Sequence, residues 1–317
     1  MEDNGVFKSS EMKTHVKAPW EDEMESGDFV SYAPGYEAGK YFNLFEKYTF
    51  TCAAPKGTSY KGEEPFSMTY YFYNPLKHGA DSSKKYPLLT FFHGATNSLN
   101  GELCINYCGG ELFASPEYQE KMGGAFILIP IANEYRAGGD KIEGGWHEDY
   151  YPAPVHALFE KVYAEYGKNL SKKLIFGNSS GGHFVWTLAK RYPDFFDALI
   201  PVGGSDLPNE EEFCALEKHG THFLVLHGKR DELCPFDEVI KPFEERLART
   251  RNCMCFFPEF VRNSDGGVAS INFGFEMGQH CLINPMQENL MFASGEPMWQ
   301  ALPRGVTGWI FDNFAEK

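Results

Sequence analysis

The sequence predicts an α/β fold with a mostly parallel central sheet. Two observations carry this prediction. Apolar runs of strand length recur along the chain, and from the third onward they are continuous rather than alternating. Continuous apolar runs are typical of strands that are covered on both faces. Segments with helical periodicity lie between them, and such alternation predicts βαβ units with right-handed crossovers.

Eight segments are expected to form strands: 47–53, 67–73, 87–94, 124–132, 172–178, 197–204, 222–228 and 254–260. Two segments carry an apolar stripe at helical spacing. The first runs from Val155 to Tyr166, and the second runs from Phe184 to Tyr192 and is ended by Pro193. We therefore expect helices there, between the strands.

The composition is that of a globular protein, with 43% apolar and 23% charged residues in 317. A net charge of -15 disfavours nucleic acids and anionic membrane surfaces as partners. No stretch reaches 18 uninterrupted apolar residues, so no membrane span is expected. The N-terminus shows no signal-peptide pattern, which favours a cytoplasmic location, although a signal removed earlier would leave the same pattern.

The domain organisation predicted here is a single catalytic domain with an extension. Residues 1–45 are acidic, rich in Gly and Pro, and fit no βαβ unit, so they are expected to form an N-terminal extension. Residues 46–317 contain neither an internal repeat nor a Pro/Gly/Ser-rich linker. They are expected to form one domain.

The segment Gly177-Asn178-Ser179-Ser180-Gly181 satisfies G-x-S-x-G between an apolar strand and an amphipathic helix. A nucleophile on such a sharp turn adopts a strained backbone, which is tolerated when the residues two before and two after it lack bulk. Ser179 has glycine at both places, whereas Ser180 has an asparagine two before it. The spacing therefore selects Ser179 as the nucleophile.

The position after a nucleophile has a use of its own. Its backbone N–H points toward a developing oxyanion and is helped by the positive end of the helix. Ser180 is therefore expected to supply one oxyanion donor. The His93-Gly94 turn after the third strand is expected to supply the second from the N–H of Ala95, with Thr96 as the alternative.

A serine hydroxyl needs a base, and the base needs an orienting acid. Asp231 lies just after the strand that ends at Gly228 and is the expected acid, with Asp206 in reserve. The neighbouring Glu232 is expected to point away from the same partner. His280 is the only histidine after Asp231 and is therefore the expected base.

With these residues in place, the sequence resembles the α/β-hydrolase superfamily. It is similar to bacterial esterases related to feruloyl esterases and polyhydroxybutyrate depolymerases. The resemblance runs from about 48 to 314 and rests on FFHGATN, LIFGNSSGGHFVWTLAKRYPDFFDALIPVGG, LVLHGKRDELCP and MGQHC, in that order. The RYPDFF at the end of the helix that follows the glycine-rich turn is typical of that branch.

The resemblance implies a central sheet of about eight strands with helices on both faces, and ester hydrolysis through an acyl-enzyme without a cofactor. It assigns Ser179, Asp231 and His280 to the triad, and the amides of Ala95 and Ser180 to the oxyanion hole. CLINP follows the histidine here, whereas relatives often have an aromatic residue there. This departure leaves open which residues line the site, but it does not affect the assignment of the base.

Large caps in this fold follow the sixth strand, and the segment SDLPNEEEFCALEKHGT is too short for one. Two other loops, 133–154 and 262–279, are long. Long loops in compact domains more often have a function than not. An aromatic wall for the substrate is one hypothesis, and anchoring of the loops is the equal alternative. The aromatic residues concerned are Trp146, Tyr150 or Tyr151, and Phe273 or Phe275.

No metal site is expected. The His-Glu-Asp run at 147–149 contains ligand types, but three consecutive side chains point in different directions. The sequence therefore favours a serine esterase acting on a small-molecule ester, either of plant-derived feruloyl or cinnamoyl type or with a small acyl group. A peptidase of the prolyl-oligopeptidase kind and a non-catalytic binding member of the fold are the alternatives.

Overall fold

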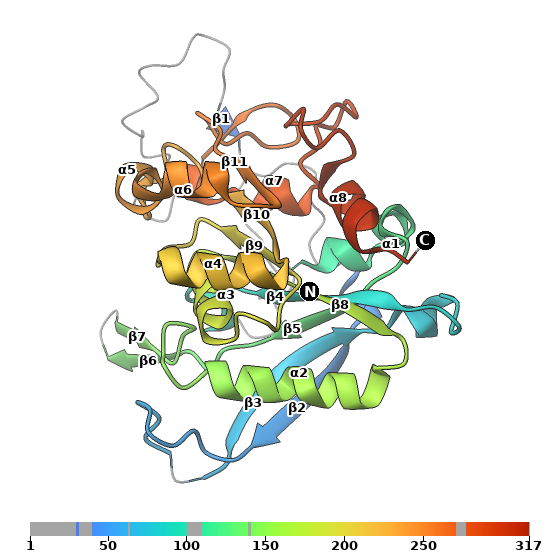
Figure 1. Ribbon diagram of the computed structural model, residues 1–317, viewed down its shortest axis with the longest axis vertical. Helices are drawn as coiled ribbons and strands as arrows, with labels where there is room; N and C mark the ends of the chain where they lie inside the picture. Colours follow the sequence, from blue (N-terminus) through green and yellow to red (C-terminus); the bar gives the residue numbers. More distant parts are fainter. Residues whose placement is uncertain are drawn as a thin grey trace.

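The computed structural model describes residues 30–31, 40–62, 64–99, 110–138, 141–270 and 277–316. Their centre is an eight-stranded sheet in the order β11-β10-β9-β8-β4-β5-β3-β2 (Figure 1). The strands are β2 (Glu46–Cys52), β3 (Phe66–Tyr73), β4 (Tyr86–Phe92), β5 (Phe126–Pro130), β8 (Leu170–Asn178), β9 (Ala198–Val202), β10 (His222–Leu226) and β11 (Cys253–Phe256). Each overlaps one of the eight expected segments.

The sheet is parallel except at β3. That strand pairs antiparallel with both of its neighbours, β2 and β5, and all the other pairs are parallel. Every residue of β4 and of β5 is buried, which explains why these two segments read as continuous apolar runs. The predicted fold class is confirmed.

Helices cover both faces of the sheet, and successive side chains of a strand enter two separate cores. Phe92 belongs to the core under α2 (Pro152–Tyr166), α3 (Ser180–Arg191), α4 (Glu210–His219), α5 (Phe236–Val239) and α6 (Glu244–Arg249). Phe91 belongs to the core under α1 (Pro116–Met122), α7 (Ile283–Gln287) and α8 (Gly305–Phe314). Short 3-10 helices lie at Phe42–Leu44, Pro75–His78, Glu111–Ala114, Lys241–Phe243 and Gly278–His280.

The link between β9 and β10 is short, as expected. Its one regular element is α4, which starts with a capping box between Asn209 and Glu212 and ends at Gly220 in the left-handed conformation. This helix packs Phe213 and Leu216 into the core of the sheet. It therefore forms part of the sandwich and not a cap.

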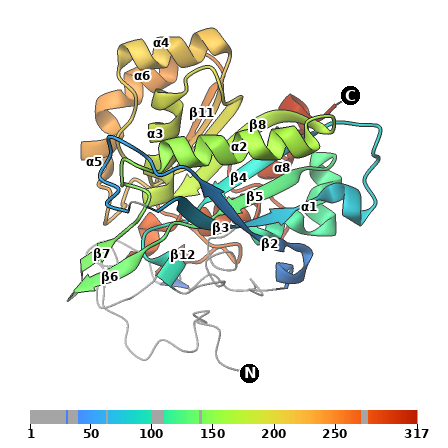
Figure 2. The same ribbon diagram turned by 90° about the horizontal axis from the view of Figure 1, so that it is seen from below.

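Both long loops contain strands that the sequence did not predict. Within 133–154, β6 (Tyr135–Gly138) and β7 (Lys141–Glu143) form an exposed antiparallel hairpin that projects from the body of the domain (Figure 2). Within 262–279, β12 (Val268–Ala269) pairs in parallel with β1 (Val30–Ser31). One short part of the expected extension 1–45 is thus paired with the loop that precedes His280.

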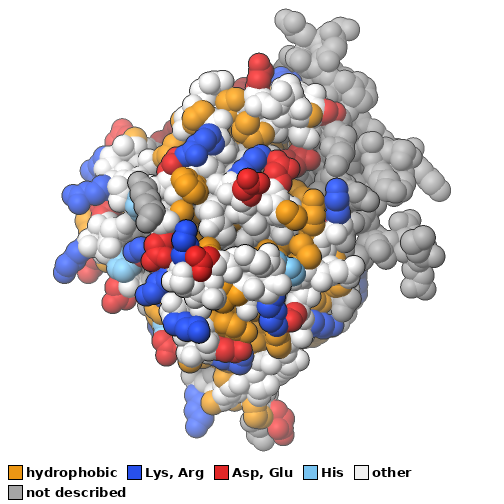
Figure 3. Space-filling model, turned by 90° about the vertical axis from the view of Figure 1, so that its right-hand side faces the viewer, with side chains coloured by type: hydrophobic (Ala, Val, Ile, Leu, Met, Phe, Trp, Pro, Cys, Tyr) orange, Lys and Arg blue, Asp and Glu red, His pale blue; other side chains and the backbone are white. Residues whose placement is uncertain are grey.

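The surface on the side of α1 and α8 carries charges of both signs, and hydrophobic side chains lie among them (Figure 3). Among the residues that the structure describes, no helix is both long and apolar enough to cross a bilayer.

Candidate active site

Ser179 lies on the sharp turn between β8 and α3, with φ 56° and ψ -117°. This left-handed backbone is uncommon for a residue with a side chain and is typical of strained functional positions. Two hydrogen bonds hold it. The Ser179 N–H donates to the carbonyl of Val202 at 2.8 Å, and the Ser179 carbonyl accepts from the N–H of His183 at 2.8 Å.

The glycines that frame Ser179 are required by close backbone approach. A Cβ on Gly181 would collide with the carbonyl oxygen of Phe92, and one on Gly177 would lie 2.5 Å from the backbone of Gly181. Phe92 ends β4, so its carbonyl brings the turn after β4 against the turn that carries Ser179. The spacing of the glycines therefore has the steric cause that the sequence suggested.

Ser180 is the first residue of α3, so its N–H has no acceptor within the helix. Its Oγ is buried and has no hydrogen-bond partner among the described residues. The hydroxyl therefore makes no contact that would give it a chemical role, while the amide is available at the positive end of a helix.

Asp231 and His280 come together although 49 positions separate them in the chain. His280 Nδ1 lies 2.9 Å from Asp231 Oδ1 and 2.8 Å from Oδ2, and both side chains are buried. Asp231 Oδ1 also accepts the N–H groups of Leu233 and Cys234, at 2.9 and 2.7 Å. A carboxylate fixed in this way orients the imidazole and stabilises its protonated form.

The imidazole of His280 faces the segment that holds Ser179. A Cβ on Gly203 would lie 3.3 Å from His280 Cε1, and Gly203 directly follows Val202, the residue that accepts the Ser179 N–H. His280 Nε2 is buried and has no hydrogen-bond partner among the described residues. The nitrogen that a base would use is thus not engaged elsewhere, and such bonds often tighten only when substrate is bound.

The other two acidic candidates have different partners. The exposed Asp206 pairs with Lys190, which also donates to the Asp206 carbonyl at 3.0 Å. Glu232 was expected to point away from the histidine, but it binds the backbone of the same loop. Its two oxygens accept the N–H groups of Gln279 at 3.3 Å and His280 at 3.0 Å. Asp231 and Glu232 therefore hold the side chain and the backbone of one residue.

The turn after β4 is built around the buried His93. Its Nε2 accepts the N–H of Ala132 at 3.0 Å, and its Nδ1–H donates to the carbonyl of Gly94 at 2.8 Å in the tautomer that satisfies both contacts. Burial lowers the pKa of His93, so the ring is neutral near pH 7. No pattern in the sequence indicated this link between the segments that follow β4 and β5.

Ala95 and Thr96 differ in what their amides do. Thr96 has φ 69°, and its N–H donates to Glu134 Oε1 at 2.8 Å. The N–H of the exposed Ala95 has no acceptor among the described residues. Of the two oxyanion donors considered from the sequence, the Thr96 amide is occupied and the Ala95 amide is available.

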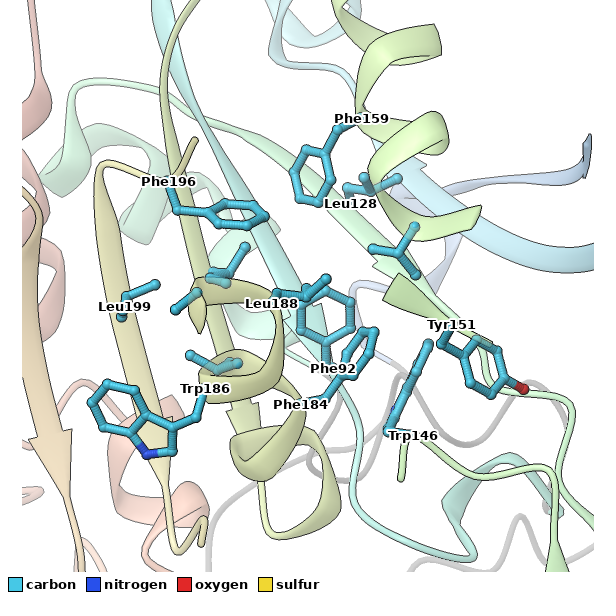
Figure 4. Packing of buried hydrophobic residues seen from close by; sticks show 14 of the residues in the cluster. Phe92, Leu128, Trp146, Tyr151, Phe159, Phe184, Trp186, Leu188, Phe196 and Leu199 are labelled. Carbon is cyan, nitrogen blue, oxygen red and sulfur yellow. The ribbon is translucent and has the colours of Figure 1, made fainter. Parts of the chain in front are cut away.

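The structure does not place Trp146 on an exposed wall. Its indole is 1% exposed and lies beside Phe184 and Tyr151, with its ring stacked on that of Phe184 at 4.9 Å between centroids (Figure 4). Tyr151 is also fully buried, and its hydroxyl donates to the carbonyl of Gly144 at 2.7 Å. Both side chains pack against Phe184 of α3, so the end of the loop 133–154 is anchored to that helix.

Tyr150 is partly exposed and packs against Tyr60 and Phe66. It is the one expected aromatic that the described residues leave accessible. Phe273 and Phe275 lie outside the described residues.

One cluster of metal-ligand types is found in the described part of the chain. The ligand atoms of Asp231, Cys234 and His280 lie within 4.8 Å of one another. The chemistry of these groups fits a hydrogen-bonded acid–base pair better than a metal site. His280 Nδ1 is bonded to Asp231, and burial raises the pKa of the Cys234 thiol to about 12, which keeps it protonated.

Residues 65–204 match the model of the Esterase family, which is described as putative esterase. A thermostable esterase of known structure is similar with a TM-score of 0.56 and 22% identity, over 78% of this chain and 61% of its own. This chain thus spans less than two thirds of that protein. No curated protein matches the chain.

Two further structures show weaker similarity. A ferulic acid esterase has a TM-score of 0.44 and 16% identity, over 68% of this chain and 90% of its own. The protein Est1E from Butyrivibrio proteoclasticus with ferulic acid bound has a TM-score of 0.38 and 17% identity, over 66% of this chain and 88% of its own. The chain has the α/β-hydrolase fold, and its residues 65–204 match the model of the Esterase family.

Proposed function

We propose that this protein is a serine carboxylesterase in which Ser179 attacks, His280 transfers the proton and Asp231 orients His280. The observation that carries the proposal is the buried Asp231–His280 pair, placed against the segment Val202–Gly203 that holds the backbone of Ser179. The match of residues 65–204 to the Esterase family supports the same reaction class.

In the first half-reaction, Ser179 Oγ forms a bond to the ester carbonyl carbon while its proton passes to His280 Nε2. The negative charge that develops on the carbonyl oxygen is bound by the N–H groups of Ala95 and Ser180. The C–O bond to the alcohol then breaks, and the alcohol leaves with the proton from His280. The acyl group stays on Ser179.

In the second half-reaction, water attacks the acyl carbon and gives its proton to His280 Nε2. The same two amides bind the second oxyanion. Its collapse breaks the bond to Ser179 Oγ, which recovers the proton, and the carboxylic acid leaves. Every proton in this sequence is transferred through His280, and water is the second substrate.

The substrate that we propose is a small-molecule ester, either with an aromatic acyl group of feruloyl or cinnamoyl type or with a small acyl group. In this proposal the partly exposed Tyr150 is the candidate contact for an aromatic acyl group. A cytoplasmic site of action, which the sequence favours, is part of the same proposal and is tested by cell fractionation.

The test uses three substrates and two variants. p-Nitrophenyl acetate, methyl ferulate and a peptide anilide are assayed with the parent protein, with Ser179→Ala and with Ser180→Ala. The proposal expects both esters to be hydrolysed, Ser179→Ala to lose at least about 10³-fold in kcat, and Ser180→Ala to retain most of the activity because it keeps its backbone N–H. Full activity of Ser179→Ala overturns the triad, and cleavage of the anilide alone favours a peptidase.

A further inference from the structure

The turn that follows β4 must aim the Ala95 amide at the substrate, yet this turn is strained. Thr96 is a β-branched residue at φ 69°, a region that such residues rarely adopt. A strained conformation persists only when its surroundings determine it. The contacts of this turn should therefore include a group that holds it in place.

One side chain makes three such contacts. Glu134 Oε1 accepts the N–H of Thr96 at 2.8 Å. Glu134 Oε2 accepts both the N–H of Ser98 at 3.1 Å and its hydroxyl at 2.6 Å. The carboxylate thus spans the turn directly after Ala95, and hydrogen bonds to a charged acceptor are the stronger kind.

Glu134 is itself fixed by its place in the fold. It lies four residues after the end of β5 and directly before β6, where the projecting hairpin begins. On its other side the chain returns closely, because a Cβ on Gly145 would lie 3.2 Å from Glu134 Oε1. The carboxylate is therefore held between the turn after β4 and the segment that follows the hairpin.

We propose that Glu134 is a positioning residue for the oxyanion hole: its carboxylate holds Thr96 and Ser98 so that the Ala95 N–H faces the ester carbonyl. The proposal rests on the proposed function. A second effect of Glu134 acts in the opposite direction and makes the proposal testable. Its negative charge repels the negative charge that develops on the oxyanion. If the charge dominated, its removal would raise the rate. The proposal requires the rate to fall.

The test is a graded series of variants with a matched control. Ser98→Ala removes one of the three hydrogen bonds, Glu134→Gln removes the charge and one acceptor, and Glu134→Ala removes all three bonds. Glu143→Gln makes the same change on β7 of the adjacent hairpin, where the carboxylate binds Tyr135 and Lys141. All are assayed with p-nitrophenyl acetate, normalised to active sites titrated with a fluorophosphonate.

The expected loss in kcat is less than about threefold for Ser98→Ala, about threefold to tenfold for Glu134→Gln, and on the order of 10- to 100-fold for Glu134→Ala. KM should change by less than about twofold, since ground-state contacts are kept. The Ki of a trifluoromethyl ketone, which forms an oxyanion on the serine, should rise in parallel with the loss in kcat/KM. Glu143→Gln should behave as the parent does.

A purely structural role would lower the number of titratable sites and leave kcat per site and the ketone Ki unchanged. That result overturns the proposal, as does a rise in kcat for Glu134→Gln. The proposed function is tested separately by Ser179→Ala. If that variant is inactive while Glu134→Ala matches Glu143→Gln, the role of Glu134 fails and the esterase assignment stands.

Discussion

Both carboxylate oxygens of Asp231 lie within hydrogen-bond distance of His280 Nδ1, at 2.9 and 2.8 Å. The pair is buried, and Oδ1 is held further by two backbone N–H groups of its own turn. This arrangement fixes both the tautomer and the direction of the imidazole, so that Nε2 is the nitrogen left to accept a proton.

Asp231→Asn is expected to lower kcat about 10³- to 10⁴-fold, because an amide stabilises the wrong tautomer of His280 and cannot balance its positive charge. Asp206→Asn is the matched control, since Asp206 pairs with Lys190 at the surface. It should retain nearly the parent kcat. Equal losses in the two variants would contradict the assignment of the acid.

Glu232→Gln is expected to lower kcat by about tenfold or less, since the amide keeps one acceptor for the two N–H groups of the His280 loop. The effect arises from less precise placement of His280 and should appear in kcat rather than KM. Steady-state kinetics on p-nitrophenyl acetate measure it. A loss in kcat as large as that of Asp231→Asn would contradict this supporting role and would indicate that Glu232 shares the role of the triad acid.

Trp146→Ala is expected to destabilise the fold by about 3–5 kcal/mol, because it empties a buried position beneath α3. Trp146→Phe should keep the ratio of kcat/KM between methyl ferulate and p-nitrophenyl acetate within about twofold, because the indole does not reach the surface. Denaturant unfolding and the two assays measure these effects. A large change in that ratio would restore Trp146 as a substrate contact.

The buried carboxyl group of Glu288 is expected to make the folding stability depend on pH. Its carboxylate accepts the N–H of Ser264 at 3.3 Å, yet burial raises its pKa to about 7. Its stabilising contribution is therefore fully present below the unfolded pKa of about 4.3 and is lost as the pH rises through about 7. Glu288→Gln should raise Tm by a few degrees at pH 8.5 and by little at pH 5. The same shift at both pH values would contradict the burial of a charge.

Much of the fold could be predicted because its signals are local. The eight strands overlap the apolar runs of the sequence, and the runs from 87–94 onward are continuous, as expected for strands covered on both faces. The turn at Ser179 could be identified because the collisions of a Cβ at Gly177 or Gly181 involve backbone only a few residues away or at the end of the neighbouring strand. Local sequence rules therefore identify the strained turn that carries Ser179.

The supporting contacts could not be predicted in the same way. Glu134 and Thr96 are 38 positions apart, and Glu232 and His280 are 48 apart. Polar residues in loops follow no periodicity, so their partners emerge only from the fold. One signal was available for Glu134, since it follows the apolar run 124–132 at the carboxyl end of a strand, where functional side chains of open α/β sheets gather.

Trp146 illustrates a position for which the sequence left two interpretations equally open, a wall for the substrate or an anchor for the loop. The ring is buried against Phe184, which agrees with an anchor. The energy gained by burying a large indole determines its place, and the sequence gives no direct sign of which surface is near enough to cover it.

In the proposed mechanism, Ser179 is the residue that is acylated. The most direct measurement labels the parent protein with a fluorophosphonate, which serine displaces with loss of fluoride, and maps the labelled peptide by mass spectrometry. The account predicts one phosphonyl group per chain on Ser179, very slow labelling of Asp231→Asn, and none of Ser179→Ala. A label on Ser180 or on another residue, or unchanged labelling of Ser179→Ala, would contradict it.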